Sequence, residues 1–307
     1  MSEPMRVSEE VRAALAAGRA VVALESTILA HGLPAGRNRK VATAVEEAVR
    51  AAGAVPATIA VLGGQLCVGL SSAELDRVCD PDADLLKLSA RDLGPAIALG
   101  RDGATTIAST SVIAHAAGIG VFGTGGLGGV HLPPPGETAS WDVSADLDVL
   151  AATPIVVVCS GVKSVLDIAA TIEVLETRSV PVLGYRTDTF PAFYRRDSRF
   201  TVPWRVDTPA EAAAVIAAHR RRGPGSGVLL ANPVPVEHEL DQELHDRLLS
   251  EGMTLVADSD VRGGDVTPVL LEHFHTASGG ASLDANEALV MANVALAAEV
   301  AVALTTT

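Results

Sequence analysis

The sequence predicts a layered α/β fold, an α/β/α sandwich around a central sheet that is largely parallel or mixed. Short apolar runs alternate along the chain with longer amphipathic segments, which is the order of strands and helices in such folds. The short runs are apolar at nearly every position, as expected when helices cover both faces of a sheet. Only 3% of the residues are aromatic, so the core is built mainly from alanine, valine and leucine, which suits stacked helices on a buried sheet.

The strands are predicted from short runs rich in Val, Ile, Leu and Ala, at 20–24, 57–62, 84–88, 104–108, 119–122, 155–159, 180–184 and 227–231. The longer amphipathic segments between and after them predict helices at 38–52, 71–78, 110–117, 163–177, 208–222, 236–251, 268–278 and 284–304. Because no internal repeat and no long linker interrupts this order, we expect one domain over residues 1–307. The loosest segments are 186–207 and 132–141 (LPPPGETASW), and the second is a candidate lid.

Two terminal segments bear on the relation to membranes. The N-terminus lacks the apolar core of a signal peptide. The one long apolar segment, 288–304, is mostly alanine and valine and contains Asn293 and Glu299. A spanning helix needs roughly 20 strongly apolar residues, so we expect a packed C-terminal helix here.

Charge and cysteine content argue against nucleic-acid-binding proteins and against disulfide- or metal-stabilised ones. The formal net charge of −14 repels phosphate backbones, so general nucleic-acid binding is not expected, although a small anion could bind where backbone amides and lysines converge. The cysteines Cys67, Cys79 and Cys159 show neither metal-binding nor disulfide spacing. This pattern predicts a reducing, cytoplasmic environment.

A glycine-rich segment imitates a dinucleotide-binding motif. Residues 123–128 read GTGGLG and follow a predicted strand. That motif must open a helix, but GVHLPPPGE follows, and three consecutive prolines prevent one. Two interpretations stay open: the glycines at 123, 125, 126, 128 and 129 leave uncrowded amides for an anion, or they form a tight turn without a ligand.

Charged residues gather at or near the predicted ends of strands, where ligands bind in open α/β sheets. Glu25 follows the first strand, Lys87 lies in DLLKL, Asp142 and Asp146 lie in WDVSAD, and Lys163 follows 155–159. Each has an ordinary structural explanation: a cap for Glu25 or Asp142, an edge lysine for Lys87. Placing all of them beside apolar strands costs desolvation free energy, unless the charges are paired with one another or take part in binding or catalysis.

Lys163 has the most specific chemistry. It stands at the predicted start of helix 163–177, where the helix dipole disfavours a cation. Burial, this dipole and a neighbouring Lys87 would all favour an uncharged amine, which can attack a carbonyl or an anomeric carbon and form a Schiff base. The alternative is an ion pair with Asp167 four residues along the helix.

A metal site is indicated only weakly. Asp142 and Asp146 could hold a divalent ion with water, and carboxylate ligands favour Mg²⁺ or Mn²⁺ over zinc. His273 and His275 are two residues apart and would face different ways on a helix, so we interpret them as structural or surface groups.

Several long motifs occur in one order and carry a family resemblance. They are VALESTILAHGLP (22–34), TIAVLGGQLCVGL (58–70), KLSARDL (87–93), GATTIASTSVIAHAAGIGVFGTGGLGGVH (103–131), WDVSADL (141–147), VVVCSGVKSVLDIAATIEVLET (156–177), PVLGY (181–185), ANPVP (231–235), TPVLLEHF (267–274) and SLDANEALVMANVALAAEVA (282–301). Over nearly its whole length the sequence closely resembles the pseudouridine-5′-phosphate glycosidase family, which includes the indigoidine-cluster protein A. The loop 132–141 and the tract 195–207 depart from the expected pattern.

The resemblance implies a lyase-type enzyme that reversibly cleaves the C–C glycosidic bond of pseudouridine 5′-phosphate to uracil and ribose 5-phosphate. It implies that Glu25 protonates the opening sugar ring and that Lys163 bonds to C1′ as an imine. The implied substrate contacts are Lys87, Ile107, His131, Ser144, Ala145, Asp146 and Asn286, with His131 and Asn286 on uracil.

The resemblance further implies one Mn²⁺ per subunit on Asp142, with Mg²⁺ as an alternative, in a cytoplasmic homotrimer with an α/β/α layered fold. Two other functions stay open. One is a related C-nucleotide glycosidase of an indigoidine-type pathway, and the other is a non-catalytic phosphosugar-binding protein.

Overall fold

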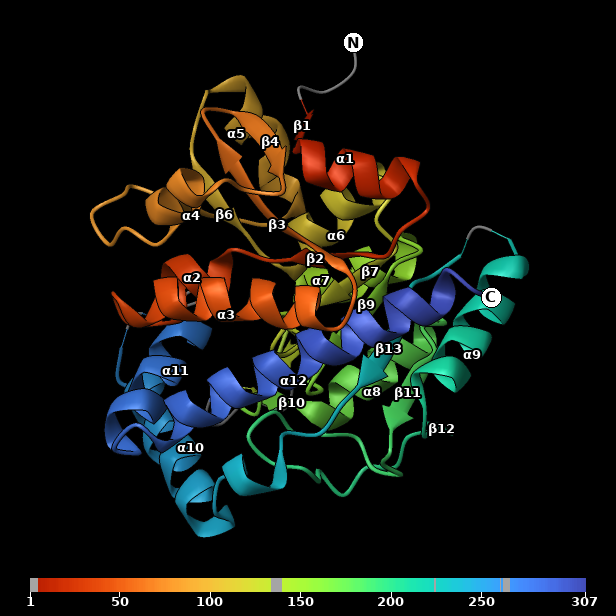
Figure 1. Ribbon diagram of the computed structural model, residues 1–307. Coiled ribbons are helices and arrows are strands. Elements are labelled where there is room, and N and C mark those ends of the chain that lie inside the picture. Colours follow the sequence, from red (N-terminus) through yellow and green to blue (C-terminus); the bar gives the residue numbers. More distant parts are fainter. Residues whose placement is uncertain (1–4, 134–139, 224, 260, 262–265) are drawn as a thin grey trace.

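The computed structural model of the protein describes residues 5–133, 140–223, 225–259, 261 and 266–307 (Figure 1). The described strands are β1 (Met5–Val7), β2 (Val21–Leu24), β3 (Val55–Leu62), β4 (Gln65–Val68), β5 (Leu86–Leu88), β6 (Gly103–Thr105), β7 (Val121–Gly123), β8 (Val130–His131), β9 (Val156–Cys159), β10 (Leu166–Asp167), β11 (Val182–Tyr185), β12 (Trp204–Val206) and β13 (Val228–Ala231).

The helices are α1 (Glu9–Ala16), α2 (Thr27–His31), α3 (Arg37–Ala51), α4 (Ser72–Val78), α5 (Leu93–Ala98), α6 (Ile107–Ala116), α7 (Ala145–Ala152), α8 (Ile168–Thr177), α9 (Pro209–Arg221), α10 (Gln242–Ala257), α11 (Val266–Ala277) and α12 (Ala281–Leu304). Two 3₁₀ turns, η1 (Ala90–Asp92) and η2 (Val236–His238), complete the described set.

One mixed sheet forms the centre of the fold. Its order is β1-β4-β3-β2-β7-β9-β13-β11-β12, and β6 pairs with β3 and β5. From β3 to β12 the neighbours along this order are parallel, whereas β3 pairs antiparallel with β4 and β6. A separate antiparallel pair joins β8 to β10. The predicted α/β layered class with a largely parallel or mixed sheet is therefore confirmed.

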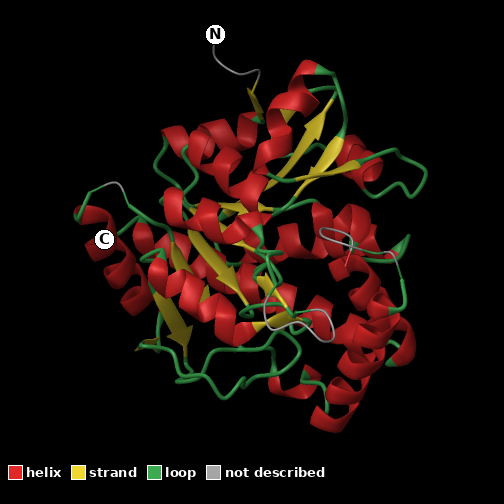
Figure 2. Cartoon of the chain, turned by 180° about the vertical axis from the view of Figure 1, so that it is seen from behind, coloured by secondary structure: helices red, strands yellow, loops and turns green. Residues whose placement is uncertain are grey.

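Helices cover both faces of the sheet (Figures 1 and 2). On one face α3 packs against β3, and α12 packs against β2, β7 and β9 with α3 and α9 beside it. On the other face α6 packs against β2, β3 and β6, and α7 lies against α6 and α8. Gly123 of β7 allows α12 to come close, because a Cβ there would lie 3.0 Å from the Cα of Val294.

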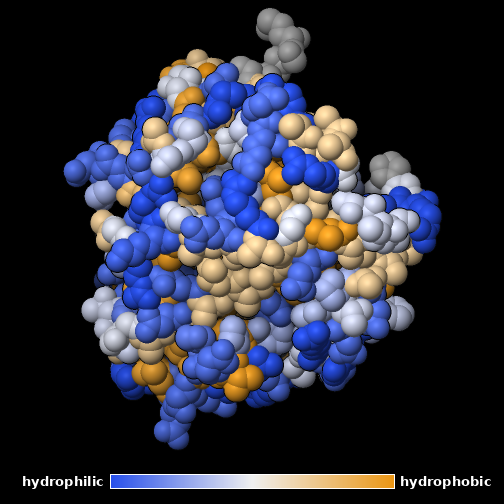
Figure 3. All heavy atoms as spheres, viewed as in Figure 1, coloured by the Kyte–Doolittle hydropathy of each residue, from blue (hydrophilic) through white to orange (hydrophobic). Residues whose placement is uncertain are grey.

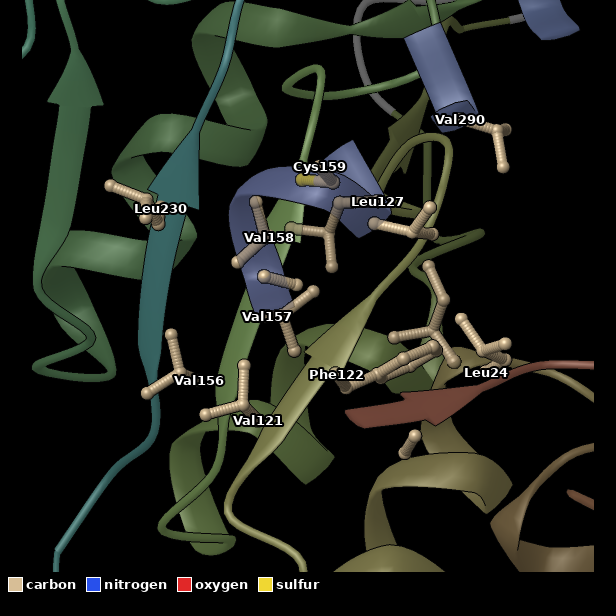
Figure 4. Close-up of a cluster of buried hydrophobic side chains, with 14 of the residues drawn as sticks. Leu24, Val121, Phe122, Leu127, Val156, Val157, Val158, Cys159, Leu230 and Val290 are labelled. Carbon is tan, nitrogen blue, oxygen red and sulfur yellow. The ribbon is translucent and has the colours of Figure 1, made fainter. Parts of the chain in front are cut away.

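The core under these helices is continuous and mostly aliphatic. In Figure 4 the valines of β9 and Phe122 of β7 lie between Leu24 on β2 and Leu230 on β13. Phe122, Val157 and Leu230 have no exposed surface. Strands that are buried on both faces explain why the sequence shows apolar runs without alternation.

Strand β3 joins the two parts of the sheet. Its residues 55–58 pair with β2, and its residues 59–62 pair with β4. At the change of partner, buried Ser26 donates from Oγ to the Ile59 carbonyl over 2.7 Å and accepts from the Thr105 amide over 2.8 Å. These bonds bring the end of β6 and the start of α6 next to the end of β2.

Most predicted elements are present, with three informative differences. The predicted strand 104–108 ends at Thr105, because helix α6 already begins at Ile107. The predicted helix 163–177 begins only at Ile168, where Asp167 caps it by accepting from the Ala170 amide. Short elements such as α1, α2 and α7 were not predicted, because their apolar stripes are brief.

The C-terminal apolar segment is a packed helix, as predicted. By length and composition, α12 is the one helix among the described residues that could cross a membrane, but half of its most apolar window is buried. It lies across the sheet in Figure 1, and its outer side forms part of the weakly hydrophobic patch in Figure 3. The helix packs against β2, β7 and β9, so its apolar character is explained by core packing.

The Ser26→Ala substitution should lower the free energy of unfolding by about 2 kcal/mol, because it leaves the buried Thr105 amide without its acceptor. Urea unfolding followed by circular dichroism measures this. Ser250→Ala, on the exposed side of α10, is the control and should change stability by less than about 0.5 kcal/mol. Equal effects of the two substitutions would contradict the role of Ser26 at the junction.

Candidate active site

Three adjacent parallel strands bring polar residues to one edge of the sheet. Glu25 follows β2, Thr124 follows β7, and Lys163 lies four residues beyond the end of β9. Because β2, β7 and β9 are neighbours and run in the same direction, their carboxyl ends meet at this edge. Ligands of open α/β sheets bind at such edges. The predicted gathering of Glu25 and Lys163 at strand ends is therefore present.

Glu25 lies in surroundings that favour its protonated form. Its carboxylate accepts a hydrogen bond from the Thr124 hydroxyl, and a small apolar pocket that includes Val45, Val290 and Val294 lies beside it. Burial raises the pKa of Glu25, and the positive charge of Lys163 and the Thr124 hydroxyl partly offset this rise. A carboxyl group with a raised pKa keeps its proton closer to neutral pH, as a proton donor requires.

The predicted position of Lys163 at a helix start is wrong. Lys163 lies in the loop between β9 and β10, where its amide donates to the Leu127 carbonyl over 3.2 Å. The helix dipole therefore does not act on it. The alternative ion pair with Asp167 is not present either, because the Asp167 carboxylate caps α8. Lys163 does lie near other charged groups, because its positive charge lowers the pKa of both Glu25 and His131.

Lys87 belongs to the same neighbourhood. It lies at an exposed position of β5 and pairs with Ala104 of β6. Its positive charge lowers the pKa of Glu25, His31 and His131. Burial lowers the pKa of His31, and the charge of Lys87 lowers it further. The chain has only three lysines, and two of them, Lys87 and Lys163, lie around Glu25.

The segment 144–146 starts helix α7. Ser144 is the N-cap, and its side chain accepts from the Asp146 amide. Asp146 is buried, and its two carboxylate oxygens accept from the Ala108 amide over 2.9 Å and from the Gly128 amide over 3.0 Å. Ile107 precedes Ala108 at the start of α6, so Asp146 ties this helix start to the glycine loop. The negative charge of Asp146 also raises the pKa of Glu25.

The residues around Asp142 fit a hydrated divalent ion better than a closed site. The Asp142 side chain is 37% exposed, and its Oδ2 lies 3.7 Å from Nδ1 of His131. Each Asp146 oxygen already accepts from a backbone amide, so Asp142 is the more accessible carboxylate of the predicted pair for an ion. The described residues contain no group of three or more His, Cys, Asp or Glu side chains that could hold a metal. One carboxylate with water ligands suits Mg²⁺ or Mn²⁺.

The glycine loop is packed rather than open. As predicted, the described residues that follow it form β8 and not a helix. The expectation of uncrowded amides is wrong: residues 123–130 are buried, and a Cβ at Gly126, Gly128 or Gly129 would overlap a neighbouring side chain. The anion that the Gly128 amide meets is the carboxylate of Asp146.

Three buried polar atoms near the predicted site residues have no hydrogen-bond partner within the described part of the chain. They are Oγ1 of Thr27, Oγ of Ser164 and Oδ1 of Asn286. Asn286 is 3% exposed, and its Oδ1 lies 3.6 Å from where a Cβ of Gly125 would stand. Buried polar groups normally find partners, so an unpaired acceptor at a strand-end site favours a ligand that donates a hydrogen bond there.

Of the candidate lid 132–141, residues 134–139 lie outside the described part of the chain. The described end of this segment carries Trp141, whose surface is 98% exposed.

Sequence reasoning missed Thr124 and the role of Asn293, which contacts the loops after three strands. The available signals were a hydroxyl residue inside the glycine loop and one amide in an apolar helix.

Comparisons with known proteins identify the family of the chain. The chain matches the family described as indigoidine synthase A like protein over residues 10–303. It is 54% identical over 300 residues to the pseudouridine-5′-phosphate glycosidase of Salinispora tropica, covering 97% of this chain and 91% of that protein. It is also 54% identical over 297 residues to the enzyme of the same name from Symbiobacterium thermophilum, covering 96% of each.

Two solved structures have the same fold. The prealnumycin C-glycosynthase AlnA, in complex with ribulose 5-phosphate, gives a TM-score of 0.90 at 38% identity, covering 100% of this chain and 98% of that one. An indigoidine synthase A-like protein from Thermotoga maritima gives 0.88 at 34% identity, covering 99% and 97%. The chain therefore belongs to the indigoidine synthase A-like family, as its motifs predicted.

Proposed function

We propose that this protein is a pseudouridine-5′-phosphate glycosidase, which reversibly cleaves the C–C bond between ribose 5-phosphate and uracil. The observation that carries the proposal is the placement of Glu25 and Lys163 after β2 and β9, on either side of β7, close enough for the lysine charge to act on the pKa of the carboxyl group. The names of relatives that are 54% identical over nearly the whole chain support the substrate.

The proposed reaction uses an amine and an acid together. The step starts with Lys163 uncharged and Glu25 protonated. The Lys163 nitrogen bonds to C1′ as the C1′–O4′ bond breaks, and O4′ takes the proton of Glu25. The amine then loses a proton, and uracil C5 gains one. The C1′–C5 electron pair next restores the C5–C6 double bond of uracil, while the nitrogen lone pair forms an iminium at C1′. Water adds to the iminium, regenerates the amine and releases ribose 5-phosphate.

The remaining predicted residues are proposed to hold the substrate. Asn286 suits an imide N–H of uracil, because its buried Oδ1 has no partner among the described residues. His131 would face the same base, and burial, opposed by Asp142, lowers its pKa. Lys87 and the helix starts at Ile107 and at 144–146 would contact the sugar phosphate, because cations and helix N-termini suit phosphate oxygens.

We also propose that Asp142 holds one Mn²⁺, or Mg²⁺, with water as the other ligands. When bound, the ion would supply a positive charge that polarises carbonyl or phosphoryl oxygens of the substrate. His131, beside Asp142, would orient the carboxylate.

The cytoplasmic location rests on three cysteines that are free and buried. The homotrimer rests on the family resemblance, and analytical ultracentrifugation should give three times the 31.4 kDa chain mass.

A second substrate class has its own support. AlnA is named a C-glycosynthase and was crystallised with ribulose 5-phosphate, and it has the same fold at 38% identity. A related C-nucleotide could therefore be the substrate on the same Glu25 and Lys163. A non-catalytic phosphosugar-binding protein would need neither the shared placement of the two residues nor the raised pKa of Glu25.

Incubation with pseudouridine 5′-phosphate should release uracil and ribose 5-phosphate, and Lys163→Ala should reduce turnover by several orders of magnitude because the covalent route is lost. Borohydride with ribose 5-phosphate should add mass to Lys163, as peptide mass spectrometry detects. Lys40→Arg, at an exposed site, is the control and should keep both properties.

The outcomes separate the alternatives. An adduct on Lys163 without cleavage of pseudouridine 5′-phosphate would indicate a related C-nucleotide substrate. Ribose 5-phosphate that binds without an adduct would indicate a binding protein. Near-normal turnover of Lys163→Ala would remove this residue from the mechanism.

Chelation should weaken or abolish activity, and Mn²⁺ should restore it. Asp142→Asn should weaken Mn²⁺ binding at least tenfold in a calorimetric titration, because the amide carries no charge. Asp148→Asn is the matched control on α7, where Asp148 pairs with Arg178 over 2.9 Å, and it should bind Mn²⁺ normally. Activity that resists the chelator, with unchanged binding in Asp142→Asn, would exclude Asp142 as a metal ligand.

A further inference from the structure

Asn293 is a fully buried amide in the middle of the apolar helix α12. Its Nδ2 donates to the carbonyls of Thr124 over 2.8 Å and Gly125 over 3.2 Å, and lies 3.1 Å from Oγ of Ser160. Its Oδ1 accepts from Nδ2 of Asn232 over 3.0 Å. One side chain thus contacts the residues that follow β7, β9 and β13, all at the edge of the sheet where the candidate site lies.

The helix reaches these loops because β7 ends in glycine. A Cβ at Gly123 would lie 3.0 Å from the Cα of Val294 and 3.1 Å from the Cβ of Ala297, so a larger residue would push α12 away. The close approach puts the amide of Asn293 within hydrogen-bond distance of backbone atoms that no water could reach without opening the core.

Two of these contacts lead directly to the proposed catalytic residues. Thr124, whose carbonyl accepts from Asn293, donates its hydroxyl to the carboxylate of Glu25. Ser160 lies three residues before Lys163, and its hydroxyl is hydrogen-bonded to Asn293. The Ser160 amide donates to the Gly125 carbonyl over 2.8 Å. Asn293 is therefore bonded to the loop after β7, which donates a hydrogen bond to the acid, and to the loop after β9, which carries the amine.

We propose that Asn293 is a positioning residue that sets the placement of Glu25 relative to Lys163, acting on the acid through Thr124 and on the amine through Ser160. The inference rests on the proposed function, because it concerns the geometry of the same acid and amine. Reacting groups that are displaced by about 1 Å can lose about 100-fold in rate, so a hydrogen-bonded centre between two loops has a large effect on turnover.

The structure offers a matched control for this amide. Asn38 on α3 is 4% exposed, and its Nδ2 also donates to two backbone carbonyls, Leu29 over 3.0 Å and Cys79 over 2.9 Å. Its described hydrogen bonds lead to none of Glu25, Thr124, Ser160 or Lys163. Asn38→Leu should therefore lower the free energy of unfolding, because it also leaves two buried carbonyls without a donor. It should not move the acid and the amine.

The first experiment compares Asn293→Leu and Asn293→Asp with Asn38→Leu in the full chain, at a temperature where unfolding curves show all variants folded. Both Asn293 variants lose the donor to Thr124 and Gly125. We expect kcat for pseudouridine 5′-phosphate to fall about 30- to 100-fold with KM changed by less than about 3-fold, and borohydride labelling of Lys163 to slow in parallel. Asn38→Leu should keep kcat within about 3-fold.

A milder pair of variants tests the link to Glu25 even if the Asn293 variants do not fold. The Thr124 hydroxyl stabilises the charged carboxylate, so its removal in Thr124→Val should raise the pKa of Glu25 further. Since the acid must carry its proton, activity falls as pH rises through this pKa, and that limb of the pH–rate profile should move to higher pH. Thr124→Ser keeps the hydroxyl and should restore the wild-type profile.

The outcomes are distinguishable. An active wild-type protein whose Asn293 variants behave like Asn38→Leu, or whose Thr124→Val variant keeps the wild-type pH–rate profile, overturns the positioning role and leaves the proposed function intact. A wild-type protein that neither cleaves pseudouridine 5′-phosphate nor forms an adduct on Lys163 overturns the proposed function and this inference with it.

Discussion

The loops at the carboxyl edge of the sheet are buried, and their backbone N–H and C=O groups must therefore find partners inside the protein. An unpaired buried polar group costs roughly 1–3 kcal/mol, so a site with several such loops is stable only if side chains satisfy them. Ser26, Asp146 and Asn293 meet this need, each by bonding backbone atoms from segments that are distant in sequence. The arrangement of the site follows from these three side chains.

The same buried bonds shape the electrostatics of the site. Asp146 is held by two backbone amides, so a negative charge stays close to Glu25 without an ion pair. Burial favours the protonated form of Glu25, whereas Lys163 and the Thr124 hydroxyl favour the charged form. The net effect is a raised pKa, which keeps the proton on Glu25 to higher pH, as a proton donor requires. An amine and an acid with these properties suit a reaction in which a sugar ring opens as a covalent bond forms.

Packing explains why the loops are rich in glycine. Side chains at 126, 128 and 129 would overlap residues that come from the 190–195 segment, from the start of α7 and from α8. The glycines thus permit the convergence of three segments around Lys163 and Asp146, and Gly123 permits the approach of α12 from the opposite face. Small residues at the strand ends are a condition for placing so many polar contacts at one edge.

The sequence by itself determined the layered class, the strands and the packed C-terminal helix, because continuous apolar runs and long amphipathic segments are local signals. It also placed Glu25 and Lys163 at strand ends, since that position depends only on where an apolar run stops. The start of α8 was misjudged: Val162 bridges to Leu127 and Gly161 to Ala192, a turn follows at Lys163, and β10 pairs with β8 before Asp167 caps the helix. Tertiary structure alone decided that Asp146 binds backbone amides and that Asn293 contacts three loops, because hydrogen-bond partners far apart in sequence leave no periodic signal.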